Sequence, residues 1–146
     1  MTPQKKGPLA LPVLIDTPVW QDYFRKERRT FREINALMDA GRVCCLDIVV
    51  AELLLTAKTE GEIKIFRDFT RIFPVLREPP SAWVEAAFLA SKLRRQRKRL
   101  SLRDCYVAVL ARTHGVALYT TNKALQRTRK AMNLGLKFYS PGKVFP

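Results

Sequence analysis

The stretch from Ser101 to Asn122 constrains the fold most, because it predicts a buried helix, a tight turn and a buried strand in succession. Ser101 can cap a helix that is apolar on almost all sides. Gly115 ends this helix, and residues 116–120 form a short apolar, β-branched and aromatic run typical of a strand. About ten helical residues rise roughly 15 Å, and about five strand residues return by roughly 16 Å. Asp104 and Asn122 are therefore predicted to lie close together.

Two earlier segments repeat the pattern of a buried strand followed by a helix. Residues 11–15 predict a strand that ends at Asp16, where Pro18 favours a helix start. Residues 43–46 predict a second strand, and Asp47 is expected to cap the helix after it, at 48–59. Three such units imply right-handed crossovers and parallel pairing. We predict an α/β fold, a three-layer α/β/α sandwich with a mainly parallel central sheet, whose carboxyl edge is where ligands bind.

The rest of the chain predicts further helices and two short strands around this framework. Helices are expected at about 29–40, 62–72, 81–99 and 123–132, and short strands at 75–76 and 136–139. With 146 residues, 47% of them hydrophobic, the chain has the size of one domain. We predict a flexible basic leader over residues 1–8 and a single domain over residues 9–146.

A formal net charge of +14, from 27 Lys and Arg against 13 Asp and Glu, indicates a polyanionic partner. Nucleic acid is favoured over a membrane surface, and a basic but merely solvated surface is the alternative. Six of the nine residues from Lys92 to Leu100 are basic. The residues predicted to contact RNA phosphates are Arg94, Arg95, Arg97, Lys98, Arg103, Lys123 and Arg127. For the basic run from Lys92 to Arg99, the alternative is a solvated helix end whose positive charges interact favourably with the helix dipole.

Cysteine usage and hydropathy predict a cytoplasmic protein. Cys44, Cys45 and Cys105 form no Cys-x-x-Cys pair, and an odd number with two neighbours suits a reducing compartment. The apolar segment 9–15 is too short for a membrane span or a signal sequence. No membrane partner is therefore expected.

Three carboxylates are candidate site residues, each with a simpler alternative. Asp16 and Asp104 follow the pattern of helix caps. Glu52 lies in an otherwise apolar helix and needs a partner, which is either an Arg in a buried pair or a metal. Converging carboxylates repel one another unless a cation lies among them. Mg²⁺ or Mn²⁺, which prefer oxygen ligands, suit such a site.

Four segments around these residues resemble the motifs of the PIN domain family. They are VLIDTPVW at residues 13–20, VVAELL at 49–54, LRDCYVA at 102–108 and LYTTNK at 118–123. Their order and spacing match the family over about residues 11–140. The size is similar to that of VapC toxins, the ribonuclease halves of toxin–antitoxin pairs.

This resemblance implies a Mg²⁺- or Mn²⁺-dependent endoribonuclease that hydrolyses RNA phosphodiester bonds with a metal-activated water. It implies that Asp16, Glu52 and Asp104 hold the metal, with Asn122 as a fourth catalytic position where the family usually has an acid. Thr17, Thr120 and Thr121 are candidates for positioning water or substrate.

The partners that the resemblance implies are RNA, a VapB-like antitoxin and a second copy in a homodimer. The alternative, suggested by Asn122, is a catalytically weakened PIN-like RNA-binding module. A Rossmann nucleotide-binding protein is disfavoured, because no Gly-x-Gly-x-x-Gly follows the first strand.

Overall fold

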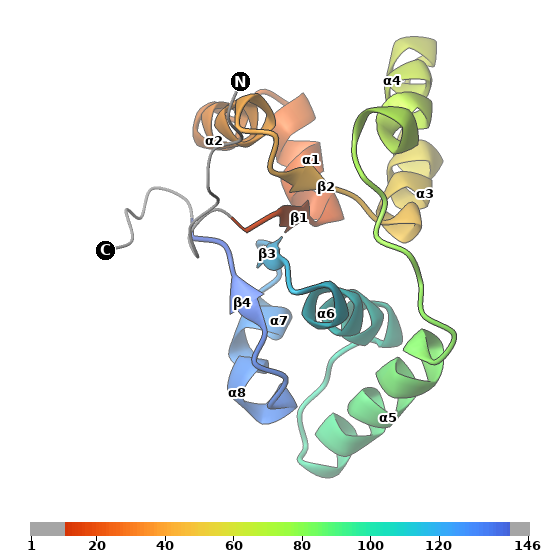
Figure 1. Cartoon of the computed structure of the whole chain (residues 1–146), viewed down its shortest axis with the longest axis vertical. Helices are drawn as coiled ribbons and strands as arrows, with labels where there is room; N and C mark the ends of the chain where they lie inside the picture. The colour runs from red at the N-terminus through yellow and green to blue at the C-terminus, as the bar shows by residue number, and fades with distance from the viewer. Residues whose placement is uncertain (1–10, 141–146) are drawn as a thin grey trace, which may run out of the picture.

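The computed structural model describes residues 11–140, so the leader predicted over residues 1–8 lies outside the described residues. Within this range, four short strands form one parallel sheet in the order β2-β1-β3-β4 (Figure 1). The strands are β1 (Val13–Ile15), β2 (Val43–Cys44), β3 (Ala117–Tyr119) and β4 (Lys137–Phe138). The parallel α/β architecture predicted from the repeated strand-helix units is confirmed.

The helices cover the sheet and pack mainly against one another in pairs. They are α1 (Thr17–Phe24), α2 (Arg28–Asp39), α3 (Asp47–Thr56), α4 (Glu60–Ile72), α5 (Ala82–Arg95), α6 (Leu102–His114), α7 (Lys123–Arg127) and α8 (Arg129–Met132). Helix α5 packs on α6, α3 on α4, and α1 on both α2 and α3 (Figure 1). The arrangement is the predicted α/β/α sandwich. Among the described residues, no helix is both long and apolar enough to cross a membrane.

The helix and strand between Ser101 and Asn122 form as predicted. The Ser101 hydroxyl accepts a hydrogen bond from the Asp104 backbone N–H at 3.0 Å and caps α6. Gly115 ends α6 with a φ of 64°, in the left-handed region that glycine adopts without strain. Seven consecutive side chains of α6, residues 105–111, are buried. This central helix therefore fixes the position of Asp104 relative to the end of β3.

Strands β1 and β3 end side by side, which brings the polar residues after them to one edge. Leu14 pairs with Leu118 and Ile15 with Tyr119. The Asp16 backbone N–H continues this pairing and donates to the Tyr119 carbonyl at 2.9 Å. Asp16 and Thr120 therefore leave the sheet at the same level.

Four predictions of element boundaries or element types were wrong. Asp47 does not cap α3, since Leu46 is the N-cap residue and makes no side-chain hydrogen bond. Asp47 is the first helical residue, where its charge is favourable to the helix dipole. The helix predicted over 123–132 is two helices, α7 and α8, which meet at Thr128. The strand predicted at 75–76 is a single bridge between Cys45 and Val75.

The fourth wrong prediction is the end of α5, which lies at Arg95 rather than near Arg99. The Lys98 backbone N–H turns back to the Leu93 carbonyl at 2.9 Å, and Arg97 adopts a φ of 60°. This reversal buries Leu100 beside the core, with 9% of its surface exposed. Burial of one leucine offsets the strain of one left-handed residue. The basic run is therefore part helix and part loop.

Candidate active site

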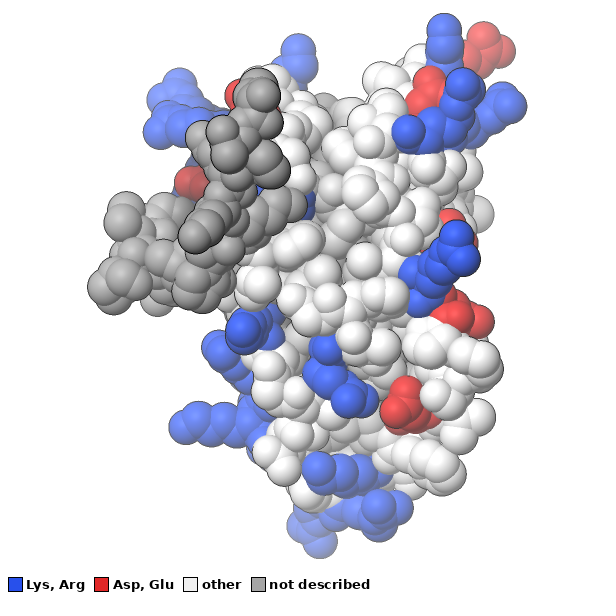
Figure 2. Space-filling view, viewed as in Figure 1, with Lys and Arg blue, Asp and Glu red and all other residues white. Residues whose placement is uncertain are grey.

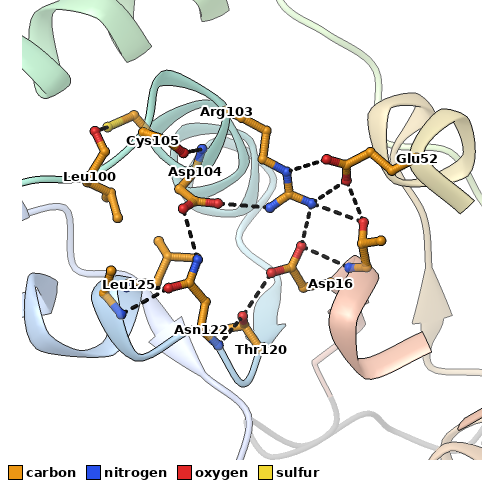
Figure 3. Close-up of polar contacts among 12 residues, drawn as sticks. Asp16, Glu52, Leu100, Arg103, Asp104, Cys105, Thr120, Asn122 and Leu125 are labelled. Atoms are coloured by element: carbon orange, nitrogen blue, oxygen red, sulfur yellow. Dashed lines mark hydrogen bonds and ion pairs between the residues drawn. The ribbon is translucent and has the colours of Figure 1, made fainter. Parts of the chain in front are cut away.

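Five polar side chains from four segments of the chain converge at the carboxyl edge of the sheet (Figure 3). Asp16 follows β1 and is the N-cap residue of α1. Glu52 lies in the middle of α3, and Asp104 in the first turn of α6. Thr120 and Asn122 follow β3, and Asn122 is the N-cap residue of α7. The geometry agrees with the predicted convergence of the three carboxylates and with the predicted proximity of Asn122 to Asp104.

Asp16 is the most buried of the three carboxylates, with none of its surface exposed. Its Oδ1 accepts hydrogen bonds from the Thr17 backbone N–H at 2.9 Å and from Arg103 Nη2 at 2.7 Å. Its Oδ2 accepts one from the Thr120 hydroxyl at 2.8 Å. Asp16 is thus both a helix cap and a member of the cluster, which were alternatives at the level of sequence.

Glu52 extends from α3 toward α1 and α6. Its Oε1 accepts hydrogen bonds from the Thr17 hydroxyl at 2.5 Å and from Arg103 Nη2 at 2.6 Å, and its Oε2 accepts one from Arg103 Nε at 3.1 Å. The two bonds from Arg103 form a bidentate pair, the strongest geometry for a guanidinium and a carboxylate. Burial alone would raise the pKa of Glu52, but the bonds from Arg103 and Thr17 outweigh it and lower this pKa.

Asp104 and Asn122 are in direct contact, as their predicted proximity requires. Asn122 Nδ2 donates to Asp104 Oδ2 at 2.8 Å, while Asn122 Oδ1 accepts from the backbone N–H groups of Ala124 and Leu125. The amide oxygen is therefore committed to the N-terminus of α7, and only the amino group faces the acids. Asn122 joins the end of β3 to α6 as a hydrogen-bond donor.

Arg103, which the sequence analysis placed among the residues predicted to contact RNA, lies among the acids in the structure. Its guanidinium lies between the three carboxylates, as Figure 3 shows, and 22% of the side chain is exposed. Nη1 contacts Asp104 Oδ1 at 3.0 Å, and Nη2 and Nε contact Asp16 and Glu52. Burial would lower the pKa of Arg103, but its bonds to Glu52 and Asp16 raise it overall. The guanidinium thus forms an ion pair with each of the three acids.

We call Asp16, Glu52, Arg103 and Asp104 the acid cluster, which has three negative charges and one positive charge. Its donors are carboxylate oxygens, the ligands that Mg²⁺ and Mn²⁺ prefer, so the residues fit a divalent cation chemically. Among residues 11–140, no three His, Cys, Asp or Glu side chains are gathered closely enough to form a metal site. The three carboxylates of the cluster are instead each ion-paired with the Arg103 guanidinium.

The other predicted positioning residues divide between the cluster and the surface. Thr17 and Thr120 are buried and hydrogen-bonded to carboxylates of the cluster. Thr121 is exposed. The structure therefore brings two of the three threonines to the acids. The one sequence signal that separates Thr120 from its neighbour is the alternation of side chains along an extended segment.

A basic groove lies between the end of α5, the start of α6 and α7. It consists of two adjoining hollows that share Lys98, Arg99 and Ala124. The cationic side chains that line it are Arg94, Arg97, Lys98, Arg99 and Arg127. Figure 2 shows Lys and Arg side chains gathered at the lower end of the molecule, where α5 ends in Figure 1. Arg95 and Lys123, also predicted to contact RNA, are exposed but do not line the groove.

The fold and the acid cluster define an α/β protein with convergent carboxylates at the carboxyl edge of a parallel sheet. The family model of the PIN domain matches residues 13–131, which include all four residues of the cluster. The chain belongs to the PIN domain family.

Solved structures share the fold at low sequence identity. VapBC-1 from nontypeable Haemophilus influenzae aligns with a TM-score of 0.70 and 18% identity over 91% of this chain and 100% of that chain. DNA-bound VapBC from Salmonella typhimurium aligns with a TM-score of 0.67 and 19% identity over 88% of this chain and 97% of that chain. A toxin–antitoxin complex from Klebsiella pneumoniae aligns with a TM-score of 0.65 and 20% identity over 90% of this chain and 99% of that chain. A sequence search of curated proteins finds no significant match.

Proposed function

We propose that this chain is a metal-dependent endoribonuclease of the PIN type and the toxin of a toxin–antitoxin pair. The observation that carries the proposal is the convergence of Asp16, Glu52 and Asp104 at one sheet edge of a PIN domain. PIN domains are generally nucleases. The fold shared with two VapBC structures and a toxin–antitoxin complex supports the toxin assignment.

In this proposal Asp16, Glu52 and Asp104 hold Mg²⁺ or Mn²⁺. When bound, such a cation lowers the pKa of a water molecule and offsets the charge that develops on the phosphodiester. Thr120 and Thr17 orient Asp16 and Glu52 through hydrogen bonds of 2.8 and 2.5 Å, so that carboxylate oxygens keep fixed directions. Asn122 does the same for Asp104.

The basic groove binds the RNA backbone beside the acids. Leu102 lines the groove and directly precedes Arg103, and Ala124 follows Asn122 by two residues. A phosphate chain lying along Arg94, Lys98 and Arg127 therefore passes next to the acid cluster. Positive side chains in a groove track the backbone of single-stranded nucleic acid without reading its sequence.

A cleavage assay with matched variants tests the proposal. End-labelled single-stranded RNA is incubated with the protein and Mn²⁺ or Mg²⁺, and EDTA is expected to stop cleavage. Asp104→Asn is expected to abolish cleavage, whereas Asp39→Asn, which removes an exposed carboxylate at the end of α2, leaves it unchanged. RNA binding without metal-dependent cleavage in the wild type would contradict the nuclease assignment.

The second candidate is an RNA-binding module with weakened catalysis. Two observations favour it: the amide of Asn122 stands where the family usually has an acid, and Arg103 occupies the space between the carboxylates. It predicts that Asp104→Asn leaves RNA affinity unchanged and that no divalent cation produces cleavage. The same assay therefore separates the two candidates.

We propose an antitoxin and a second copy of the chain as protein partners, in a cytoplasmic location that suits the three free cysteines. Large apolar side chains are exposed on α3 and α5, including Leu55 at 84% and Phe88 at 70%. Exposed apolar patches on a protein surface are typical of interfaces. The chain is co-expressed with a small upstream reading frame, captured by affinity and measured by light scattering. A complex that contains two copies of the chain and the product of that frame is expected. A monomer without a bound product of that frame contradicts this part of the proposal.

A further inference from the structure

We propose that Arg103 is an internal counterion of the acid cluster and that a divalent cation binds there only by exchange with its guanidinium. The inference rests on the proposed function, because it concerns the same three carboxylates. Beyond that function, it assigns to Arg103 the role of competing with the divalent cation for the three carboxylates.

The contacts of Arg103 support this role, because they reach every acid of the cluster. The guanidinium lies 2.7 Å from Asp16, 2.6 Å from Glu52 and 3.0 Å from Asp104. Its Nε and both terminal nitrogens all donate to carboxylate oxygens. A surface arginine pairs with one acid, whereas this side chain neutralises three at their point of convergence.

Charge and space make the two cations mutually exclusive. A divalent cation among these oxygens would lie next to a guanidinium at a few ångströms, where like charges repel strongly in a partly buried site. The cluster has one positive charge against three carboxylates, so its net charge is negative and attracts a second cation. The oxygens that would bind this cation already accept hydrogen bonds, most of them from Arg103. Entry of the metal therefore requires departure of Arg103.

Arg103 is able to leave without a change in the fold. It lies in the first turn of α6, next to the exposed Leu102, and 22% of its side chain already contacts solvent. An arginine side chain can rotate outward about its own torsions while the helix stays in place. The remaining donors to the acids, from Thr17, Thr120 and Asn122, come from other elements and stay where they are.

Calorimetric titration of Mn²⁺ into metal-free protein tests the exchange. Arg103→Gln is expected to bind Mn²⁺ about tenfold more tightly or better, because the competing charge is gone. Arg112→Gln is the matched control: it removes one arginine from the same helix, where Arg112 is exposed and 3.6 Å from Glu85. It is expected to match the wild type. Equal or weaker binding by Arg103→Gln would overturn the proposal.

A measurement on the wild type covers the case in which Arg103→Gln fails to fold. The ¹⁵N–¹H signal of Arg103 Nε, assigned by its loss in Arg103→Lys, is followed while Mg²⁺ is added. Exchange predicts that this N–H loses its protection from solvent as Mg²⁺ binds, while the Nε signal of Arg112 is unchanged. Mg²⁺ binding with an unaltered Arg103 signal overturns the proposal, and so does absence of Mg²⁺ binding in both wild type and variant.

These readouts separate the inference from the proposed function. Tighter Mn²⁺ binding by Arg103→Gln without cleavage by either protein supports the counterion and refutes the nuclease. Metal-dependent cleavage by the wild type, with Mn²⁺ affinity unaffected by Arg103→Gln, supports the nuclease and refutes the counterion.

Discussion

The acid cluster and the basic groove both include residues of the segment that follows α5, yet arginine has opposite roles in them. Arg103 is largely buried and contacts three carboxylates. Arg97 and Lys98, a few residues earlier, are exposed and face solvent from the loop after α5. The sequence places all of them in one basic stretch. What separates their roles is the set of side chains that the sheet edge brings within reach.

The energetic consequences of charge removal should differ accordingly. A buried ion pair contributes little net stability when formed, but removal of one partner leaves the other charged and unpaired. An exposed charge keeps its hydration whether or not a neighbour is present. Single substitutions in the acid cluster should therefore lower the stability of the protein, whereas substitutions in the basic groove should weaken RNA binding.

Asp16→Ala is expected to have the largest effect. It removes the fully buried carboxylate beside Arg103 and the cap of α1, and should lower the free energy of unfolding by about 3 kcal/mol. Urea denaturation measures this difference, with Asp39→Ala as an exposed control. A loss below about 1 kcal/mol would show that the cluster is no more coupled than a surface pair.

Neutralising the groove should weaken RNA binding without destabilising the fold. The variant Arg94→Gln, Lys98→Gln, Arg127→Gln is expected to reduce the slope of log affinity against log salt by about 2, at roughly 0.7 per contact. Its free energy of unfolding should stay within about 0.5 kcal/mol of the wild type.

A triple variant on α4 provides the matched control for the groove. Lys64→Gln, Arg67→Gln, Arg71→Gln removes the same charge from a hollow that also contains Glu60 and Asp68. RNA affinity and salt slope should stay close to those of the wild type. Equal losses in the two triple variants would mean that overall charge, and not the groove, determines binding.

The sequence predicted the architecture of the site because that architecture follows from local patterns. Apolar runs with polar ends locate the strands, and a glycine after a buried helix locates the turn. Parallel pairing then places Asp16 and Thr120 at one edge. The end of α5 was not predictable in the same way, because burial of Leu100 decides it and this depends on contacts with the core.

The role of Arg103 was only half contained in the sequence. Three converging carboxylates require a cation, and the sequence analysis assigned that need to Mg²⁺ or Mn²⁺ while considering an arginine partner for Glu52. The residue before Asp104 is the arginine that meets it. Adjacent residues on a helix point in different directions, so only the side-chain conformation shows that Arg103 folds back over the cluster.

Asn122→Asp is expected to have a smaller effect on stability than Asp16→Ala. The new carboxylate still caps α7 but faces Asp104 as an acid instead of a donor, so the metal-free protein should lose about 1 kcal/mol of stability. The added charge should strengthen Mn²⁺ binding. Thermal unfolding with EDTA and calorimetry with Mn²⁺ measure the two changes. Unchanged Mn²⁺ affinity would mean that residue 122 acts only as a cap.

The smallest expected effect is a pH dependence that the cluster has and the groove lacks. The pKa of Glu52 lies below its ordinary value of 4.5, so in the folded protein this carboxylate stays ionised to lower pH than in the unfolded chain. Its contribution to stability is therefore present above pH 4.5 and is lost as the pH falls through the lowered pKa.

Glu52→Gln isolates this contribution, because the amide has the same shape but does not titrate. In EDTA, the wild type should be more stable than Glu52→Gln at pH 7, and this difference should shrink as the pH falls below 4.5. Arg and Lys keep their protons throughout this range, so the stability difference between the wild type and the groove variant should not change with pH. Urea titrations at pH 7 and near pH 3.5 give both differences. A constant difference for Glu52→Gln would mean that Arg103 stabilises the neutral amide as well as the carboxylate, and that shape, not charge, holds the cluster together.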